Sequence, residues 1–423
     1  MGTTEAAEKA GLPVRSLRVV VEAGPDEGAR VDASEERLTV GTAEGNDLVL
    51  RDPTVSRFHA ELIRRGDGVQ VLDHASTNGT RAHGVRLCDA IVDAGTELTL
   101  GHTTLRVVDG AQVTVALHEE SELGELVGRT PVMRRLMHRI ARAARSRTPV
   151  LLIGESGSGK ELIAQALHPG DAPFVTVDCG ALAPALVASE LFGHEKGAFT
   201  GADRRHIGAF ERAHGGTLFL DEIGELPASI QATLLGALER RRFRRIGGRD
   251  EVEVDVRVVS ATHRDLRGEV NAGRFRLDLY YRIAVVVLAI PPLRERTEDI
   301  PLLVERFLRH AGHDGPVEDV IGAELMSVLS AHRWPGNVRE LRNVVEATLA
   351  MGEAPPLYPD LDTSEPWAGL GYKEARAAVL HDFESRYLPK LLERASGNVS
   401  RAAREGRMDR TYLIKLLQKH GLR

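Results

Sequence analysis

The chain has 423 residues, 42% hydrophobic and 27% charged, so it is long enough for about three globular domains and is not a disordered protein. Its two cysteines, Cys88 and Cys179, are too few for a disulfide framework or a zinc site, and we expect both to be buried. The longest apolar run, residues 283–290, is too short to span a membrane, and the first residues lack a signal-peptide core, which favours a cytoplasmic protein.

Charge is distributed unevenly along the chain. The whole sequence carries a net charge of −6, whereas residues 371–423 contain 12 Lys or Arg and 6 Asp or Glu, a net charge of +6. The remainder therefore carries −6 minus +6, or −12. A basic C-terminal module favours binding to nucleic-acid phosphates, although a solvated helix face gives the same count.

The first predicted domain, residues 17–109, consists of short strands. The apolar stretches 17–22, 37–41, 58–65 and 97–101 are separated by Gly, Asp and Asn-Gly turns at close spacing, without helical periodicity. This pattern predicts an all-β sandwich.

The pattern changes at residue 125. Over residues 125–297 apolar strands alternate with amphipathic helices, which is typical of a parallel α/β sheet. Residues 298–352 have helical patterns throughout, and the proline-rich acidic stretch 353–370 is typical of a linker. Residues 371–423 are predicted to form a final all-α domain.

A glycine-rich loop joins a strand to a helix in the α/β region. VLLIGESGSGKE, residues 150–161, contains G-x-x-x-x-G-K. The glycines allow backbone N–H groups to point at phosphate oxygens, and the lysine brings a positive charge to the β- and γ-phosphates of a nucleotide. We therefore predict an ATP site formed by Gly154, Glu155, Ser156, Gly157, Ser158, Gly159, Lys160 and Glu161. A Ser or Thr more commonly stands at the last of these positions.

A second motif lies downstream in TLFLDE, residues 217–222, an apolar strand that ends in two acids. Asp221 suits Mg²⁺ binding, and Glu222 suits polarising the attacking water. Buried paired acids without a cation would be costly. Together the two motifs predict a nucleoside triphosphatase that uses ATP and Mg²⁺.

Residues 126–352 resemble the AAA+ domain of bacterial enhancer-binding proteins, the ATPases that activate the sigma-54 form of RNA polymerase. The resemblance rests on GESGSGKE, SELFGHEKGAFTGA, GTLFLDEIGELP, FRLDLYYRI, PPLRERTEDI and WPGNVREL, in family order. It implies an α/β P-loop subdomain over residues 125–297, a helical lid over 298–352, and a homo-oligomeric ring that is a hexamer when active and a dimer when inactive.

The hexapeptide GAFTGA is the most specific of these motifs. In the family this loop rises from the ring when ATP binds and contacts the sigma factor and promoter DNA. The resemblance implies this contact for Gly197, Ala198, Phe199, Thr200, Gly201 and Ala202. The two glycines would be the flexible joints of the loop. The alternative is a phenylalanine buried in a core beside a surface turn.

The same resemblance implies further residues of the ATP site. Arg276 and Arg282 in FRLDLYYRI stand at the arginine-finger positions, which act on the γ-phosphate of a neighbouring subunit. Arg339 in WPGNVREL matches a lid arginine that senses the nucleotide. His263 stands where the family commonly has Asn, and Asp178 also replaces an Asn, so we expect the restraint on the second acid of the pair to differ here.

RLTVGTAEGNDLVLRDPTVSRFHAEL and STNGT resemble a forkhead-associated domain, which binds phosphothreonine in extended peptides. Ser56 and Arg57 match the phosphate-contacting positions, and Thr77 and Asn78 match the loop that bonds the peptide. His59 is expected to fix the loop around the serine.

One departure weakens this second resemblance. Thr42 stands where the family has an arginine, so Arg57 would be the principal cation for the phosphate. A sandwich that serves only intramolecular packing is the alternative.

Residues 383–422 resemble the Fis-type helix-turn-helix of the same enhancer-binding proteins. A first helix is predicted to start at an N-cap in SGNVSRAAREG and a second at Asp409. Arg407 stands where the family has the turn glycine. The residues expected to contact DNA are Arg410, Thr411, Tyr412 and Lys415. A small helical dimerisation module is the alternative.

These resemblances predict a regulator that binds upstream DNA and uses ATP hydrolysis to remodel the closed complex of sigma-54 RNA polymerase, under the control of a phosphothreonine protein or peptide. The alternative from another class is a phosphopeptide-regulated DNA-binding repressor whose ATP site serves oligomerisation. An unfoldase is disfavoured by the predicted helix-turn-helix.

Overall fold

The computed structural model describes residues 11–357, except 34, 35, 67 and 182. Beyond these it describes segments 398–406 and 408–419 and the positions 376, 380, 384, 388–389, 391–392 and 395. The chain divides into two compact units, Met1–Pro355 and Pro356–Arg423, and each is described by itself.

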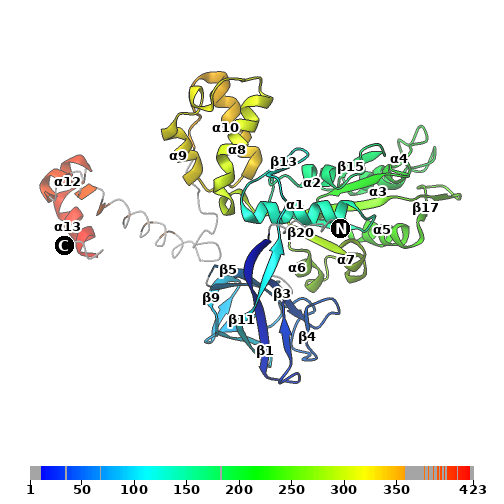
Figure 1. Ribbon diagram of the computed structural model, residues 1–423, viewed down its shortest axis with the longest axis horizontal. Helices are drawn as coiled ribbons and strands as arrows, with labels where there is room; N and C mark the ends of the chain where they lie inside the picture. Colours follow the sequence, from blue (N-terminus) through cyan, green and yellow to red (C-terminus); the bar gives the residue numbers. More distant parts are fainter. Residues whose placement is uncertain are drawn as a thin grey trace, which may run out of the picture. The chain divides into compact units, whose positions relative to one another are not determined.

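The first unit begins with a β-sandwich of two sheets, drawn in blue and cyan in Figure 1. One sheet has the order β2-β1-β11-β10-β7-β8, and its strands are β1 (Gly11–Ala23), β2 (Arg30–Asp32), β7 (Thr80–Ala82), β8 (Val85–Leu87), β10 (Glu97–Leu100) and β11 (Thr103–Ala116). The other has the order β4-β3-β5-β6-β9, formed by β3 (Arg37–Gly41), β4 (Leu48–Val49), β5 (Ala60–Arg65), β6 (Gly68–Asp73) and β9 (Asp89–Asp93). We call residues 11–116 the N-terminal sandwich. The predicted all-β fold is confirmed.

Alternation along the strands produces the core of the N-terminal sandwich. In β1, Leu17, Val19 and Val21 are buried, whereas the residues between them are partly exposed. They share one apolar cluster with Val69 and Val71 of the facing sheet. Burial of each such side chain contributes about 1.5–3 kcal/mol to the free energy of folding.

One prediction for this region is wrong. Cys88 is exposed, because it lies in the short connection between β8 and β9, where its side chain has no facing sheet to pack against. Cys179 in the central domain is buried, as expected.

The central domain contains a five-stranded parallel sheet with the order β15-β16-β19-β14-β20. These strands are β14 (Val150–Ile153), β15 (Phe174–Asp178), β16 (Thr217–Asp221), β19 (Arg257–Thr262) and β20 (Val286–Ala289). Two small hairpins accompany the sheet, β12 (Glu122–Leu123) with β13 (Leu126–Val127), and β17 (Arg242–Arg244) with β18 (Glu251–Glu253).

Helices cover both faces of this sheet (Figure 1). On one face α1 (Pro131–Ala144) and α2 (Lys160–Ala166) pack on Val150 and Leu152, whereas Leu151 points to the opposite face. The remaining elements are α3 (Pro184–Phe192), α4 (Ala209–Arg212), α5 (Ala228–Arg240), α6 (Leu266–Asn271), α7 (Leu277–Ile283), η1 (Ile223–Glu225), η2 (Leu293–Glu295) and η3 (Thr297–Asp299). Parallel strands covered on both faces are typical of α/β folds, so the predicted class is confirmed.

A helical segment follows the sheet. It contains α8 (Ile300–His310), η4 (Val317–Asp319), α9 (Ala323–Ala331) and α10 (Asn337–Met351). The fully buried Trp334 lies just before α10, and its indole N–H donates to the carbonyl of Leu329 at 2.9 Å. This bond fixes the turn that leads back to the glycine-rich loop.

The second unit contains two described helices, α12 (Val399–Glu405) and α13 (Arg410–Lys419). The side chain of Asn398 caps α12 by accepting from two backbone N–H groups, as the sequence predicts. The two helices share an apolar cluster with Leu388 and Leu391. Arg407, the expected turn position, lies outside the described residues.

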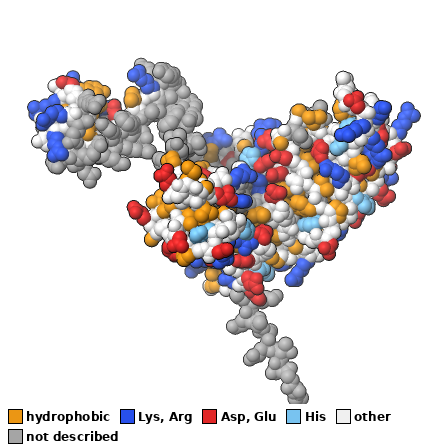
Figure 2. Space-filling model, turned by 90° about the horizontal axis from the view of Figure 1, so that it is seen from above, with side chains coloured by type: hydrophobic (Ala, Val, Ile, Leu, Met, Phe, Trp, Pro, Cys, Tyr) orange, Lys and Arg blue, Asp and Glu red, His pale blue; other side chains and the backbone are white. Residues whose placement is uncertain are grey.

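None of the helices within the described ranges is long and apolar enough to cross a membrane. In the view of Figure 2, basic and acidic side chains are interspersed over the described surface of residues 11–357.

Candidate functional site

The glycine-rich loop lies between β14 and α2, at the carboxyl end of the parallel sheet. Gly157 and Gly159 have φ of 73° and 103°, a left-handed conformation that residues with a Cβ rarely adopt. A Cβ at Gly157 would lie 2.3 Å from the carbonyl oxygen of Gly336, so the loop also packs closely on the segment before α10.

Lys160 opens α2 and is buried, with only 7% of its surface exposed. Its Nζ donates to the carbonyl of Gly154 at 3.1 Å and to Oε1 of Glu222 at 3.0 Å. A buried ammonium group beside a glycine-rich loop suits the binding of a triphosphate. Phosphate oxygens can take the place of the Gly154 carbonyl and the Glu222 carboxylate as acceptors for Lys160.

Glu222 follows β16 directly and has φ of 50°. Its Oε2 accepts from the backbone N–H of His263 at 3.2 Å and lies 2.7 Å from His263 Nδ1. Burial alone would raise the pKa of Glu222, but the bonds from Lys160 and His263 outweigh it and lower this pKa. The carboxylate is therefore held ionised, as a group that polarises water must be.

Asp221 is the last residue of β16, and its Oδ1 accepts from the backbone N–H of Glu222 at 3.0 Å. Burial is the main reason that the pKa of Asp221 is raised, and the Glu222 charge adds to it. A bound cation would relieve this cost, so the residue fits the predicted Mg²⁺ site.

His263, and not Asp178, restrains Glu222 in this structure. Asp178 instead accepts from the backbone N–H groups of Gly180 and Ala181, at 2.8 and 3.0 Å. The altered restraint expected from the two sequence departures is therefore a bond from His263, the residue directly after β19.

The helical segment is bonded to the glycine-rich loop by Asn337, which the sequence analysis did not single out. Its Nδ2 donates to Oε2 of Glu155 at 3.0 Å and to the carbonyl of Ser156 at 3.1 Å, and its Oδ1 accepts from Leu293 N at 2.8 Å. Its φ of 53° in a buried site explains why an Asn stands here, because Asn tolerates this conformation, but neither property is visible in the sequence. Arg339 reaches the same loop through a 3.2 Å bond to Ser156 Oγ.

Two further residues of the glycine-rich loop have different surroundings. Ser158 is buried and donates to the carbonyl of Glu155 at 2.7 Å, so it stabilises the loop itself. Glu161 is exposed at the start of α2. Arg294, which the sequence analysis missed, forms two bonds to the Glu155 carboxylate at 2.7 and 2.9 Å.

Arg276 and Arg282 are not brought to this site within the chain. Arg276 is paired with Asp278, at 2.7 Å for the closest atoms, and Arg282 donates to the carbonyl of Leu238 at 2.8 Å. Both are exposed at α7.

The GAFTGA loop follows α3. Gly197 and Gly201 have φ of 82° and 95°, and Phe199 between them is 40% exposed. The Phe199 ring lies against that of His194, with centroids 4.9 Å apart, and His194 Nδ1 is 2.7 Å from Ser189 Oγ of α3. Phe199 is thus a surface side chain, and the core alternative is wrong.

The other members of this loop differ in exposure. Ala202 is buried, whereas Thr200 is exposed at the tip. Ala198 lies against Gly247 of the β17–β18 connection, where a Cβ would come within 2.8 Å of the alanine methyl group. The loop is therefore anchored at its base and exposed at its tip.

The four predicted phosphopeptide residues lie on two neighbouring loops of the N-terminal sandwich. Ser56 Oγ accepts from the backbone N–H of Thr77 at 3.0 Å, and the Asn78 side chain donates to the carbonyl of Thr54 at 2.7 Å. Arg57, Thr77 and Asn78 are exposed. This arrangement brings a hydroxyl, a guanidinium and an amide to one open surface.

His59 stabilises the first of these loops. It is fully buried, and its Nδ1 accepts from the backbone N–H of Ser56 at 3.0 Å. The structural role expected for this histidine is confirmed.

The four predicted DNA-contacting residues are exposed on α13: Arg410, Thr411, Tyr412 and Lys415. Asp409 caps this helix by accepting from two backbone N–H groups, and Leu413, Leu416 and Leu417 are buried on the opposite side. Within the described residues, these basic and polar side chains thus form an exposed face of α13.

Three family models match separate stretches of the chain. Residues 126–289 match the family described as sigma-54 interaction domain, and residues 294–361 match the AAA+ ATPase lid domain. Residues 20–111 match the family described as inner membrane component of T3SS, cytoplasmic domain.

The chain is 45% identical over 306 residues to the transcriptional regulatory protein GlrR of Escherichia coli (strain K12), with 70% of this chain and 68% of that protein covered. It is similar to the crystal structure of NtrX from Brucella abortus in complex with ADP, with 38% identity, a TM-score of 0.50, and 70% and 69% of the two chains covered. A structure described under phosphothreonine-dependent FHA domain interactions is 26% identical with a TM-score of 0.20, and covers 22% of this chain and 95% of that chain.

Proposed function

Because this chain belongs to the family of sigma-54-dependent transcriptional regulators and has their ATPase domain, we propose that it uses ATP hydrolysis to remodel the closed complex of sigma-54 RNA polymerase. The exposed Phe199 at the tip of a glycine-flanked loop is the observation that carries this proposal. The ring stands in the hexapeptide that the resemblance assigns to the contact with the sigma factor, and its exposure leaves it available for that contact.

In the proposed reaction, Lys160 and the backbone of the glycine-rich loop hold the triphosphate of ATP. Glu222 accepts a proton from the attacking water, because its carboxylate is kept ionised. Asp221 would hold Mg²⁺, which neutralises charge on the phosphates. Arg276 and Arg282 of a neighbouring subunit would stabilise charge on the γ-phosphate, so hydrolysis requires assembly into a ring, which we propose to be a hexamer.

The segment between the two motifs offers a path from the nucleotide to the loop. Gly180, just after β15, lies beside Glu222, where a Cβ would be 3.7 Å from the glutamate Cβ. Further along the chain, α3 contains Ser189, whose Oγ lies 2.7 Å from His194 Nδ1, and the Phe199 ring rests against the His194 ring. A shift of Glu222 on hydrolysis would move α3 and release the Phe199 side chain toward the sigma factor.

Two further activities complete the proposed function. The exposed face of α13 would bind upstream DNA with Arg410, Thr411, Tyr412 and Lys415, supported by the net charge of +6 over residues 371–423. The N-terminal sandwich would act as a forkhead-associated domain that binds phosphothreonine. Ser56 and Arg57 would contact the phosphate, and the loop of Thr77 and Asn78 would bond the peptide.

Replacing Phe199 with alanine tests the proposed output. We expect Phe199→Ala to keep ATP hydrolysis and DNA binding but to lose most ATP-dependent transcription by sigma-54 polymerase, because the substitution removes only an exposed ring. Open-complex formation on a sigma-54 promoter, with matched ATPase assays, measures this. Val328→Ala, also at an exposed apolar side chain, is the control. Unchanged transcription by Phe199→Ala would favour a repressor whose ATP site serves assembly.

A further inference from the structure

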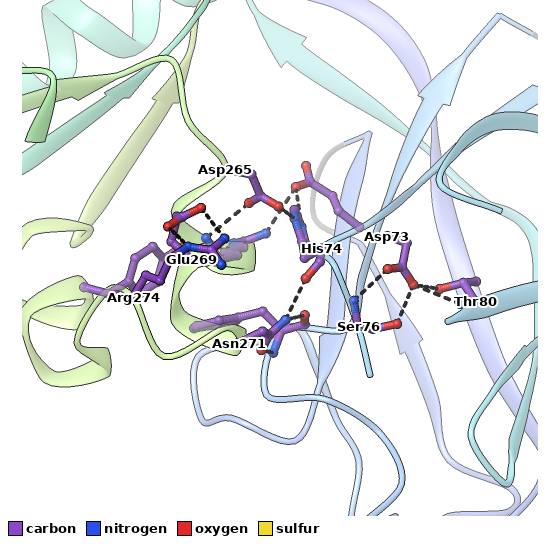
Figure 3. A network of polar contacts seen from close by, with 12 residues as sticks. Asp73, His74, Ser76, Thr80, Asp265, Glu269, Asn271 and Arg274 are labelled. Carbon is purple, nitrogen blue, oxygen red and sulfur yellow. Dashed lines mark hydrogen bonds and ion pairs between the residues drawn. The ribbon is translucent and has the colours of Figure 1, made fainter. Parts of the chain in front are cut away.

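The N-terminal sandwich is bonded to the ATPase domain through the same two loops that carry the predicted phosphopeptide residues. The first loop, residues 54–59, contains Ser56 and Arg57, and the second, residues 73–80, contains Thr77 and Asn78. Each loop also contacts Asn271 of α6, and Figure 3 shows the contact of this residue with His74 of the second loop. Ligand surface and docking surface are therefore two sides of the same loops.

Asn271, at the end of α6, bonds to both loops at once. Its Nδ2 donates to the carbonyl of Phe58 at 2.6 Å and to the carbonyl of His74 at 2.8 Å. Its Oδ1 accepts from the backbone N–H of Phe58 at 3.3 Å. One side chain of the ATPase domain thus fixes the spacing of the two loops.

The side chain of Phe58 strengthens this contact. It is 2% exposed and belongs to the apolar cluster of α6 and α7, not to the core of the N-terminal sandwich. Its ring lies 5.0 Å from that of Tyr280, and the guanidinium of Arg267 lies 5.6 Å above it. The residue next to Arg57 is therefore held by the ATPase domain.

Charged groups surround the second loop. His74 Nδ1 lies 2.9 Å from Asp265, and Arg267 is 3.1 Å from the buried Glu61. Burial alone would lower the pKa of His74, but its bonds to Asp265 and Glu61 outweigh it and raise this pKa. These opposite charges add to the docking contact.

Hydrogen bonds to Asp73 connect the two ends of the second loop, on either side of Thr77. Asp73 accepts from the backbone and hydroxyl groups of both Ser76 and Thr80, at 2.6 to 2.9 Å (Figure 3). Thr77 in turn donates its backbone N–H to Ser56 Oγ of the first loop. A change in the position of one loop would therefore move the residues of the predicted phosphate-binding surface.

We propose that Asn271 is a positioning residue for the phosphothreonine site, so that docking on α6 preorganises the two loops and a phosphopeptide in turn tightens docking. The proposal rests on the phosphothreonine recognition proposed above. The ligand surface is open in the docked arrangement, since Arg57, Thr77 and Asn78 are exposed, so the two events are compatible. Preorganised loops bind more tightly because a larger fraction of the protein is competent to bind.

The test compares full-length variants in binding to a degenerate peptide pool with a central phosphothreonine, with the unmodified pool as reference. We expect Asn271→Ala to weaken binding of the phosphorylated pool by roughly tenfold, the effect of about one net buried hydrogen bond. Arg274→Ala, which breaks an exposed ion pair with Glu269 next to the same helix, is the matched control and should bind as the parent does.

Two outcomes separate a failure of phosphothreonine recognition from a failure of the role of Asn271. If the parent chain does not prefer the phosphorylated pool, phosphothreonine recognition fails and this inference fails with it. If the parent prefers it and Asn271→Ala binds equally well, recognition stands and the role of Asn271 is overturned.

A second measurement needs no substitution. Coupling between two events is reciprocal, so the phosphorylated pool should slow hydrogen exchange of the Phe58 amide, which donates to Asn271. We expect a slowing of roughly tenfold, matching the affinity change. If a saturating concentration of the phosphorylated pool leaves hydrogen exchange of the Phe58 amide unchanged, the proposal is overturned. This result does not depend on whether the variants fold.

Discussion

Replacing Glu222 with glutamine should lower kcat for ATP hydrolysis by roughly 10²–10⁴-fold, the usual contribution of a general base. The amide has the same shape but cannot accept the proton of the attacking water. ATP binding should persist, because Lys160 and the glycine-rich loop are unchanged and Lys160 loses an internal carboxylate partner that competes with phosphate. Steady-state hydrolysis and equilibrium nucleotide binding measure the two effects separately.

Glu225→Gln is the matched control for this substitution. Glu225 lies three residues downstream in the same connection and pairs with Arg264 at 2.5 Å. Its loss should leave kcat close to that of the parent. A Glu222→Gln variant that retained most of its kcat would contradict the assigned role, and the catalytic base would have to be sought elsewhere.

Replacing Asn337 with alanine should destabilise the ATPase domain by about 2–4 kcal/mol. The change leaves the buried N–H of Leu293 without its acceptor. It also places alanine, which lacks the side-chain amide, in a left-handed conformation with φ of 53°. It also removes both bonds to the glycine-rich loop, so nucleotide affinity should fall as well. Calorimetry should show a melting temperature lower by roughly 5–10 °C for this domain.

Arg342→Ala on the same helix tests whether this effect is specific. Arg342 forms an exposed pair with Glu346, so its loss should change stability by no more than about 0.5 kcal/mol. Equal melting temperatures for Asn337→Ala and Arg342→Ala would show that the helical segment is not anchored through the buried amide.

The parts of the site that could be predicted from the sequence are those written in contiguous motifs. A glycine-rich loop between a strand and a helix, and two acids at the end of an apolar strand, require local backbone geometry that few other sequences satisfy. Lys160 and Glu222 lie 3.0 Å apart although they are 62 residues apart in the chain, because β14 and β16 end at the same edge of the sheet. The alternation of strands and helices predicted a parallel sheet, and the structure supplied the order of its strands.

The contacts that were missed are single side chains that bridge distant segments. Asn271 and Phe58 are 213 residues apart, and neither stands in a pattern that indicates a domain contact. The sequence predicts Phe58 to be a core residue of a strand in the N-terminal sandwich. It is buried, but in the apolar cluster of the ATPase domain. Asn337 lies within a recognised motif, yet only its left-handed backbone and its buried position reveal why an amide is needed there.

The contact between His263 and Glu222 could be predicted only in part from the sequence. The substitution of an amide by imidazole is visible in the sequence, and so is the acid at Asp178. Which of the two would bond to Glu222 could not be predicted, because both strands end near it. The structure assigns the bond to His263, whose backbone N–H and ring nitrogen both lie against the same carboxylate oxygen.

The most direct measurement is the association of the purified full-length protein with sigma-54 in the presence of ATP, ADP or a transition-state analogue of ATP hydrolysis. Hydrolysis at Lys160 and Glu222 is proposed to control the exposure of Phe199, so association should require the analogue and be lost in Phe199→Ala. A protein that hydrolyses ATP at the parent rate but binds sigma-54 equally, or not at all, in every nucleotide state would contradict the account.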